Sequence, residues 1–234
     1  MSRKNPSVPT RAEPSSARLV ATLGLAGLLS GLVIVTVYQT TLPAITAYKA
    51  KVLREAVLRV LPGATRVQRL VYRGGRLIVK EKKGKGEDVV FGGYDTEGRL
   101  LGYAIPAAGP GFQDTIRLIY GYLPTEHRVV GMEVLESRET PGLGDKIYKD
   151  AAFVADFRDL SVGPKIVAVK KGTKSAANEV DAITGATISS KAVVRIINES
   201  NALWLERLSG PGAAPPFQKA GTVAQDEAEE VKKP

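Results

Sequence analysis

The stretch Asp181-Ala-Ile-Thr-Gly-Ala-Thr-Ile-Ser-Ser-Lys191 joins a glycine turn to the start of an amphipathic helix. Gly185 permits a tight turn, and hydroxyl side chains follow it at Thr187, Ser189 and Ser190. The N–H groups and dipole of a helix start favour a bound anion, by about 0.3–2 kcal/mol for the dipole. Thr187 is expected at the N-cap or one residue before it, so the stretch indicates either a phosphate site with a nucleophilic hydroxyl or an ordinary capped helix.

Two further loops are rich in glycine and proline. Glu139-Thr-Pro-Gly-Leu-Gly144 follows a predicted strand, and Gly109-Pro-Gly-Phe-Gln-Asp114 separates two predicted strands. Loops of this kind hold functional groups on a rigid scaffold, although a plain turn and a strand connector are the simpler interpretations.

The region between residues 65 and 136 has the alternation and turn signals of a β-sheet. Arg73-Gly-Gly-Arg76 predicts a hairpin, and strands are predicted at 70–72, 77–79, 89–91, 100–105, 115–120, 129–135 and 166–169. Helical spacing predicts a short helix within 145–159, with Phe153 and Phe157 inward, and a helix over 188–208 whose apolar residues, Trp204 included, form core. We therefore predict an α+β domain over residues 63–208, with an antiparallel sheet and flanking helices.

An uninterrupted apolar or small-residue run from Leu19 to Val37 predicts a transmembrane helix over residues 19–40, because about 20 apolar residues span a bilayer. A buried core helix and a signal peptide cleaved near Ala44 or Ala47 are the alternatives. Arg18 adjoins the run, whereas the residues just after Val37 are uncharged. This favours a cytoplasmic N-terminal arm, residues 1–18, and a domain on the other side of the membrane. Residues 43–62 are predicted to form a helical stalk.

Composition limits the chemistry of the chain. It has no cysteine and one histidine, which excludes disulfides, thiolate iron–sulfur ligation, CxxCH haem attachment and Cys/His zinc clusters. If the protein handles electrons, an organic cofactor must carry them. The net charge of +9 is spread along the chain without a nucleic-acid-binding motif, so it indicates proximity to membrane lipid and no nucleic acid. Residues 209–234, rich in Pro, Gly, Ala and charge, are predicted to be a disordered tail.

The chain resembles a family of FMN-binding domains. The resemblance is carried by the membrane run and by three segments: GPGFQDTIRLIYGY, GMEVLESRETPGLGDKI and DAITGATISSKAVV. That family includes the G subunit of the Rnf ion-translocating oxidoreductase and the C subunit of the sodium-pumping NADH:quinone reductase. The resemblance covers about residues 19 to 205. The length of the chain and the sequence ITGATISS are more similar to the Rnf subunit than to the quinone reductase subunit. The resemblance implies FMN bonded through its phosphate to Thr187, within the turn Thr184-Gly185-Ala186; many members have serine where this chain has Thr184. It also implies that four residues line the flavin, namely Glu139, Thr140, Gly142 and Leu143. Lys191, four residues after Thr187, could add a positive charge near the phosphate.

The resemblance further implies the function and surroundings of the chain. It would be an electron-transfer subunit of an ion-translocating oxidoreductase in the bacterial inner membrane, with a single span and a periplasmic domain. Its partners would be the other subunits of the complex and a flavin transferase that attaches the FMN. We expect no catalytic residue of its own and no metal. The alternatives are the C subunit of the quinone reductase, a flavin-bearing regulator, a structural subunit without cofactor and a non-redox, membrane-anchored module for a phosphate ligand.

Overall fold

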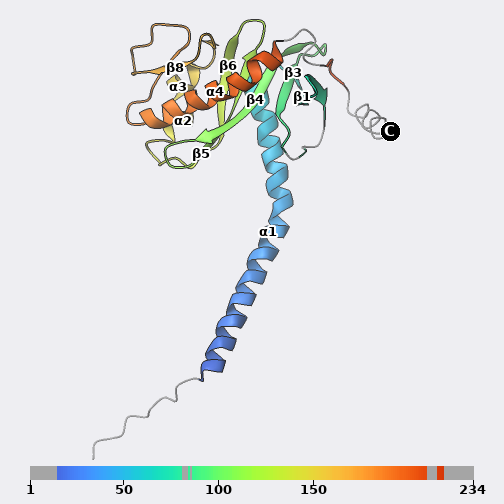
Figure 1. The fold of residues 1–234 in the computed structure, drawn as a ribbon, viewed down its shortest axis with the longest axis vertical. Helices are drawn as coiled ribbons and strands as arrows, with labels where there is room; N and C mark the ends of the chain where they lie inside the picture. The colour runs from blue at the N-terminus through green and yellow to red at the C-terminus, as the bar shows by residue number, and fades with distance from the viewer. Residues whose placement is uncertain (1–14, 81–83, 85, 210–214, 219–234) are drawn as a thin grey trace, which may run out of the picture. The chain divides into compact units, whose positions relative to one another are not determined.

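The structure is a computed structural model that describes residues 15–80, 84, 86–209 and 215–218 (Figure 1). The chain divides into two compact units between Ala50 and Lys51. Residues 1–14 of the expected N-terminal arm lie outside the described residues. The rest of that arm is helical from Ser16 onward, so the first helix begins before the predicted span.

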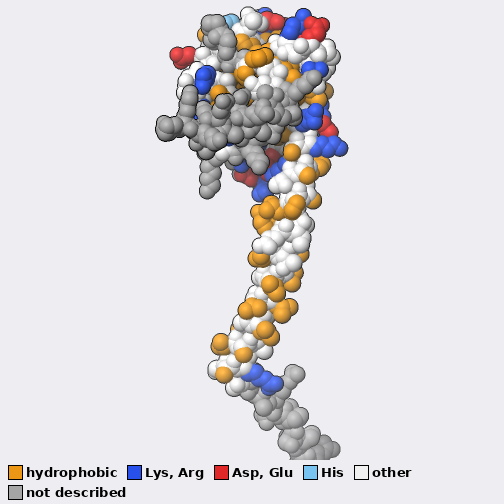
Figure 2. Space-filling view, turned by 90° about the vertical axis from the view of Figure 1, so that its right-hand side faces the viewer, with side chains coloured by type: hydrophobic (Ala, Val, Ile, Leu, Met, Phe, Trp, Pro, Cys, Tyr) orange, Lys and Arg blue, Asp and Glu red, His pale blue; other side chains and the backbone are white. Residues whose placement is uncertain are grey.

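The first helix, α1 (Ser16–Val60), is continuous through both the predicted span and the predicted stalk. Within the described residues it is the one helix long and apolar enough to cross a membrane. Its apolar side chains are exposed, and Figure 2 shows them in orange along the helix. Pro43 lies inside α1, where it has no N–H to donate to the preceding turn. The second unit begins at Lys51, earlier than the predicted domain boundary at residue 63.

A seven-stranded antiparallel sheet, in the order β2-β1-β3-β4-β5-β6-β7, organises the second unit. Its strands are β1 (Arg66–Arg73), β2 (Arg76–Val79), β3 (Val89–Tyr94), β4 (Leu100–Pro110), β5 (Thr115–Leu123), β6 (Arg128–Glu136) and β7 (Leu160–Ser161). Arg73 pairs with Arg76, which confirms the predicted hairpin. The predicted strand at 166–169 is β8 (Val167–Val169), and it pairs in parallel with β9 (Glu179–Asp181), which was not predicted. The α+β prediction is confirmed.

Different helices cover the two faces of this sheet. On one face α4 (Thr187–Leu208) packs through Val193, Ile197 and Trp204 into the main core, and Figure 1 shows it in orange across the strands. This confirms the core assignment for Ala192, Val193, Ile196, Ile197 and Trp204. It is wrong for Leu203, which is 42% exposed. On the other face Val57 and Val60, in the last turns of α1, form a second core with residues of β4 and β5.

The end of α1 approaches the sheet backbone itself. Gly121 of β5 and Gly131 of β6 are paired residues, and both face Val60. A Cβ at Gly121 would lie 1.9 Å from the carbonyl oxygen of Val60, and one at Gly131 would lie 2.9 Å from its Cα. Side chains at these positions would hold the helix away from the strands, so the glycines make its close seat possible.

Two short helices replace the single helix predicted within 145–159: α2 (Lys146–Lys149) and α3 (Ala151–Ala155). The Asp150 carboxylate accepts the N–H groups of Ala152 at 3.0 Å and Phe153 at 3.2 Å. Because Asp150 caps the second helix, it also ends the first. Phe153 and Phe157 point inward as predicted, with ring centroids 5.3 Å apart.

Most of the predicted disordered tail, residues 210–214 and 219–234, lies outside the described residues. The four described residues from Pro215 to Gln218 differ from that prediction, because they lie against β1 and β3 and bond to Tyr94 and Gln68. Composition alone predicted too little apolar surface for order, but one phenylalanine and the backbone of this segment find partners on the sheet.

Candidate functional site

The glycine turn before α4 is locked by its own backbone and by one serine. The N–H of Ala186 donates to the carbonyl of Ile183 at 2.9 Å, and Gly185 has a φ of +82°. The Ser190 hydroxyl donates to the carbonyl of Ala186 at 2.9 Å and accepts the N–H of Ile183 at 3.1 Å. The turn is therefore held in one shape, and the helix start that follows it has a fixed direction.

Thr187 is the first residue of α4, and Ala186 occupies the N-cap. This corrects the prediction that Thr187 is the cap or precedes it, because the turn at Gly185 ends one residue earlier than expected. Within the described chain no side chain caps this helix start. Thr187 is exposed, and among the described residues its hydroxyl has one hydrogen bond, a long one of 3.4 Å to the carbonyl of Ile183. An exposed threonine thus lies at a helix start whose N–H groups suit an anion.

Glu139 ties the three sequence motifs together. One carboxylate oxygen accepts the N–H groups of Phe112 at 3.0 Å, Gln113 at 2.9 Å and Asp114 at 3.4 Å. The other accepts the hydroxyl of Ser189 in α4 at 2.5 Å. Glu139 is 5% exposed, so its carboxylate is committed to these four donors. It is placed to position the loops around the helix start, more than to present its carboxylate to a ligand.

The ionisation of Glu139 follows from these contacts. Burial raises the pKa of Glu139, but the Ser189 hydroxyl and the three backbone N–H groups together lower it more, so the pKa lies below its usual value. A carboxyl with a lowered pKa adds stability that is present above its unfolded pKa, about 4.3, and lost as the pH falls through its folded pKa. At neutral pH the Glu139 carboxylate is therefore charged, and its hydrogen bonds to the loop at 112–114 and to α4, here called the Glu139 junction, are intact.

The Glu139 junction is also tightly packed. A Cβ at Gly144 would lie 2.7 Å from a Glu139 carboxylate oxygen and 2.9 Å from the Ser189 hydroxyl. The glycine there lets the loop after β6 lie directly against α4.

Two other residues of this loop, Thr140 and Leu143, lie against neighbouring loops. The Thr140 hydroxyl donates to the Gln113 side chain at 2.9 Å, and Gly142 has a φ of +79°. A methyl carbon of Leu143 would lie 3.9 Å from a Cβ at Gly185, which places the two loops side by side. The structure thus gathers the predicted residues of both loops at the start of α4. Thr184 and Lys191 are exposed, with Lys191 in α4 after the turn.

Sequence reasoning missed several residues of this site. It noted the hydroxyls of Ser189 and Ser190 near the helix start, but it did not assign them as the partner of Glu139 and the lock of the turn. Phe112 and Ile188 were also missed: both are exposed apolar side chains in the loop and the helix that bond to Glu139, at 64% and 59% exposure. Phe112 next to Gly111 was an available sequence signal, whereas only the folded chain shows that both segments bond to Glu139.

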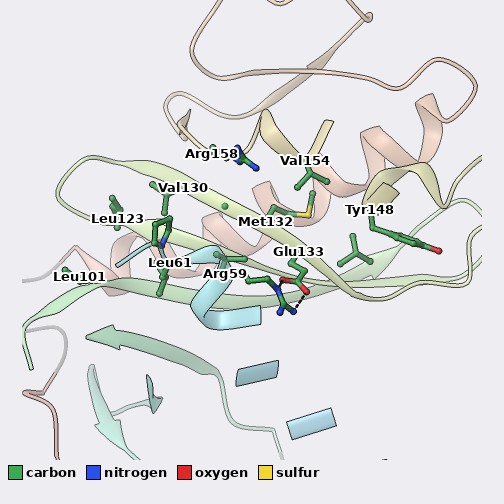
Figure 3. A pocket seen from close by; sticks show the side chains of 14 residues that line it. Arg59, Leu61, Leu101, Leu123, Val130, Met132, Glu133, Tyr148, Val154 and Arg158 are labelled. Atoms are coloured by element: carbon green, nitrogen blue, oxygen red, sulfur yellow. Dashed lines mark hydrogen bonds and ion pairs between the residues drawn. The ribbon is translucent and has the colours of Figure 1, made fainter. Parts of the chain in front are cut away.

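A separate groove lies away from this site (Figure 3). Its volume is about 780 Å³, and it lies over β6 beside the end of α1, with Met132, Val154 and Tyr148 among its lining residues. Figure 3 shows Arg59 at its edge, bonded to Glu133 at 2.6 and 2.7 Å. None of the predicted site residues lines this groove.

We expect Glu139→Ala to lower the free energy of unfolding by about 2 kcal/mol. The buried Ser189 hydroxyl would lose its acceptor, which costs about 1–3 kcal/mol, and three partly buried N–H groups would lose theirs as well. Glu139→Gln keeps an acceptor oxygen and should lose less. The measurement is urea unfolding of the full chain in detergent micelles, followed by emission of Trp204, the single tryptophan, which is buried. Glu97→Ala, which removes an exposed 3.0 Å ion pair to Arg99, is the control, with an expected loss below about 1 kcal/mol. Equal losses for the two alanine variants would contradict the assigned role.

Comparison with known proteins agrees with this geometry. A family model described as an FMN-binding domain matches residues 111–201, a span that includes Glu139 and Thr187. The chain is 30% identical over 186 residues to the G subunit of the ion-translocating oxidoreductase complex of Haemophilus influenzae, covering 78% of this chain and 87% of the relative. It is 28% identical over 185 residues to the protein of the same name from Methanosarcina acetivorans, covering 78% of this chain and 91% of the relative.

Solved structures share the fold at lower identity. The chain superimposes on NqrC of Shewanella oneidensis with a TM-score of 0.59 and 20% identity, covering 69% of this chain and 98% of that one. It also superimposes on the C subunit of the Na⁺-translocating NADH-quinone reductase of Parabacteroides distasonis, with a TM-score of 0.57 and 18% identity, covering 71% and 97%.

Proposed function

The chain belongs to the family of G subunits of ion-translocating oxidoreductase complexes, and from this we propose that it is a flavoprotein that passes electrons between partner subunits of such a complex. FMN is its electron carrier, joined through its phosphate to the Thr187 hydroxyl. The protein has no catalysis of its own. The isoalloxazine ring supplies the redox chemistry, and this chain binds, orients and shields it.

The observation that carries the proposal is the exposed Thr187 hydroxyl at the uncapped start of α4, inside the span matched by the FMN-binding family. Helix N–H groups favour the phosphate, and the exposed Lys191 adds positive charge nearby. Leu143 lies beside the turn as an apolar surface for the ring. Thr184, Gly185 and Ala186 shape the turn, and Thr140 and Gly142 shape the facing loop.

The attachment requires an activated flavin donor. A bond forms between the Thr187 oxygen and phosphorus, a phosphorus–oxygen bond to the donor's leaving group breaks, and the hydroxyl proton goes to a base. Among the described residues, the hydrogen bond of this hydroxyl is to a backbone carbonyl and to no side chain that could act as the base. We therefore assign the step to a separate flavin transferase. A tethered flavin has the advantage that it cannot diffuse away where no FMN pool replaces it.

The membrane anchor is α1, whose apolar part is exposed along its length. We place the anchor in the bacterial inner membrane and the second unit in the periplasm, because Arg18 adjoins the apolar run and its other end is uncharged. The lipid headgroups and the other subunits of the complex are its neighbours there. An inactive periplasmic reporter enzyme fused after Ser209 would overturn this orientation.

The full chain produced together with a flavin transferase is expected to give a band that fluoresces under ultraviolet light on a denaturing gel. Without the transferase the band should be dark. A reversibly bound flavin would fluoresce in the native protein and be lost on denaturation, which would favour the phosphate-ligand module. A dark band from native and denatured protein alike would end the FMN proposal.

A further inference from the structure

A short C-terminal segment, Pro215–Gln218, lies on β1 and β3 and bonds to a fully buried tyrosine. The Tyr94 hydroxyl donates to the carbonyl of Pro215 at 3.0 Å, and Tyr94 is 0% exposed. Burial raises the pKa of Tyr94 to about 12, so the hydroxyl remains a donor at neutral pH. Within the described chain this carbonyl is its one hydrogen-bond partner. Buried polar groups are rarely left unbonded, so the tyrosine depends on the segment.

Gln68 of β1 binds the backbone of the same segment. Its side-chain amide donates to the carbonyl of Gln218 at 3.2 Å, and its carbonyl oxygen accepts the N–H of Gln218 at 3.4 Å. Gln68 is 7% exposed. One amide that donates to and accepts from a single residue imitates a strand partner, which is how extended peptides are recognised.

Phe217 supplies the side-chain contact between these two backbone contacts. Its ring meets the ring of Tyr94 edge to face, with centroids 5.5 Å apart and planes at 65°. The guanidinium of Arg66 also lies 5.1 Å from the centroid of the Phe217 ring. An aromatic ring satisfies both contacts, because it offers a face to the cation and an edge or face to the tyrosine.

We propose that this surface of β1 and β3 is a peptide-binding site, occupied by the chain's own segment Pro215–Gln218. Its ligand is an extended segment of four residues. The first is a proline whose carbonyl accepts a hydrogen bond, the third is aromatic, and the fourth offers its backbone N–H and C=O to Gln68. The segment acts as a strap: it covers Tyr94 and Gln68 and fastens the C-terminal part of the chain to the first strands of the sheet. This inference is independent of FMN.

Hydrogen exchange of the full chain in detergent micelles, read by mass spectrometry, tests the strap. Prolines carry no amide hydrogen, so Phe217 and Gln218 hold the amides that report on the segment. We expect the Gln218 amide to exchange about tenfold faster in Gln68→Ala than in the unaltered chain. The substitution removes both hydrogen bonds to Gln218, and a factor of ten corresponds to about 1.4 kcal/mol. Gln39→Ala, which alters an exposed glutamine of α1, is the control and should change nothing.

The aromatic requirement has its own pair of variants. Phe217→Ala should speed exchange at Gln218 as much as Gln68→Ala does, whereas Phe217→Tyr should retain the protection. Unchanged Trp204 emission shows that the domain stays folded in each. Unprotected Gln218 in the unaltered chain, or protection that survives both Gln68→Ala and Phe217→Ala, overturns the proposal. Flavin on a denaturing gel is expected in all variants, so failure of the strap and failure of the FMN proposal are distinguishable.

Discussion

Thr187→Ala produced with a flavin transferase is expected to carry no covalently bound flavin. The substitution removes the only atom proposed to accept the phosphate, and the neighbouring hydroxyls do not replace it. Ser189 and Ser190 are buried and bonded to Glu139 and to the turn, so they are not available to the transferase. The result is read as a dark band on a denaturing gel and as the loss of the flavin mass from the denatured chain.

Two variants separate the attachment from the shape of the turn. Thr187→Ser keeps a hydroxyl at the same place and should retain flavin, whereas Thr184→Ala removes the nearby exposed hydroxyl and should leave attachment intact. The fold should survive Thr187→Ala, because among the described residues its hydroxyl has a single long hydrogen bond, and Trp204 emission checks this. Full labelling of Thr187→Ala, or loss of labelling in Thr184→Ala alone, would move the attachment to another residue.

Gly121→Ala is expected to separate the end of α1 from the sheet and to destabilise the second unit by at least about 3 kcal/mol. Overpacking a tight core costs typically about 1–3 kcal/mol, and here the clash is with backbone. The new Cβ would lie 1.9 Å from the oxygen of Val60, and no side-chain rotation can relieve that contact. Displacing the helix would also expose Ala56, Val57 and Leu61, which are at most 1% exposed.

The absence of cysteine makes this displacement directly measurable. A single cysteine introduced by Val57→Cys should react slowly with a maleimide in the otherwise unaltered chain, and much faster when Gly121→Ala is added. Gly31→Ala is the matched control, because a Cβ at that exposed position of α1 meets nothing within 4 Å. Slow labelling and unchanged urea unfolding in Gly121→Ala would show that the helix does not rest on the strand backbone.

Local pattern was sufficient for most of the architecture. Alternation and turn residues placed the strands from 70 to 135, and helical spacing placed 188–208, because these patterns reflect which side chains face a core. It failed at Asp150, where a cap splits a predicted helix, and at β9, whose three residues are too short to show a period. It also separated a stalk from a membrane helix that the structure joins through Pro43.

By itself the sequence determined the apolar span, the strands, the glycine turn before α4 and the family likeness that singles out Thr187. Only the tertiary structure decided which distant residues meet: Glu139 with Ser189, Gly121 with Val60, and Gln68 with Gln218. The reason is physical, since local patterns record whether a residue is buried but not its partner. That partner is set by strand order and by the close approach of backbones, which form when the whole domain packs.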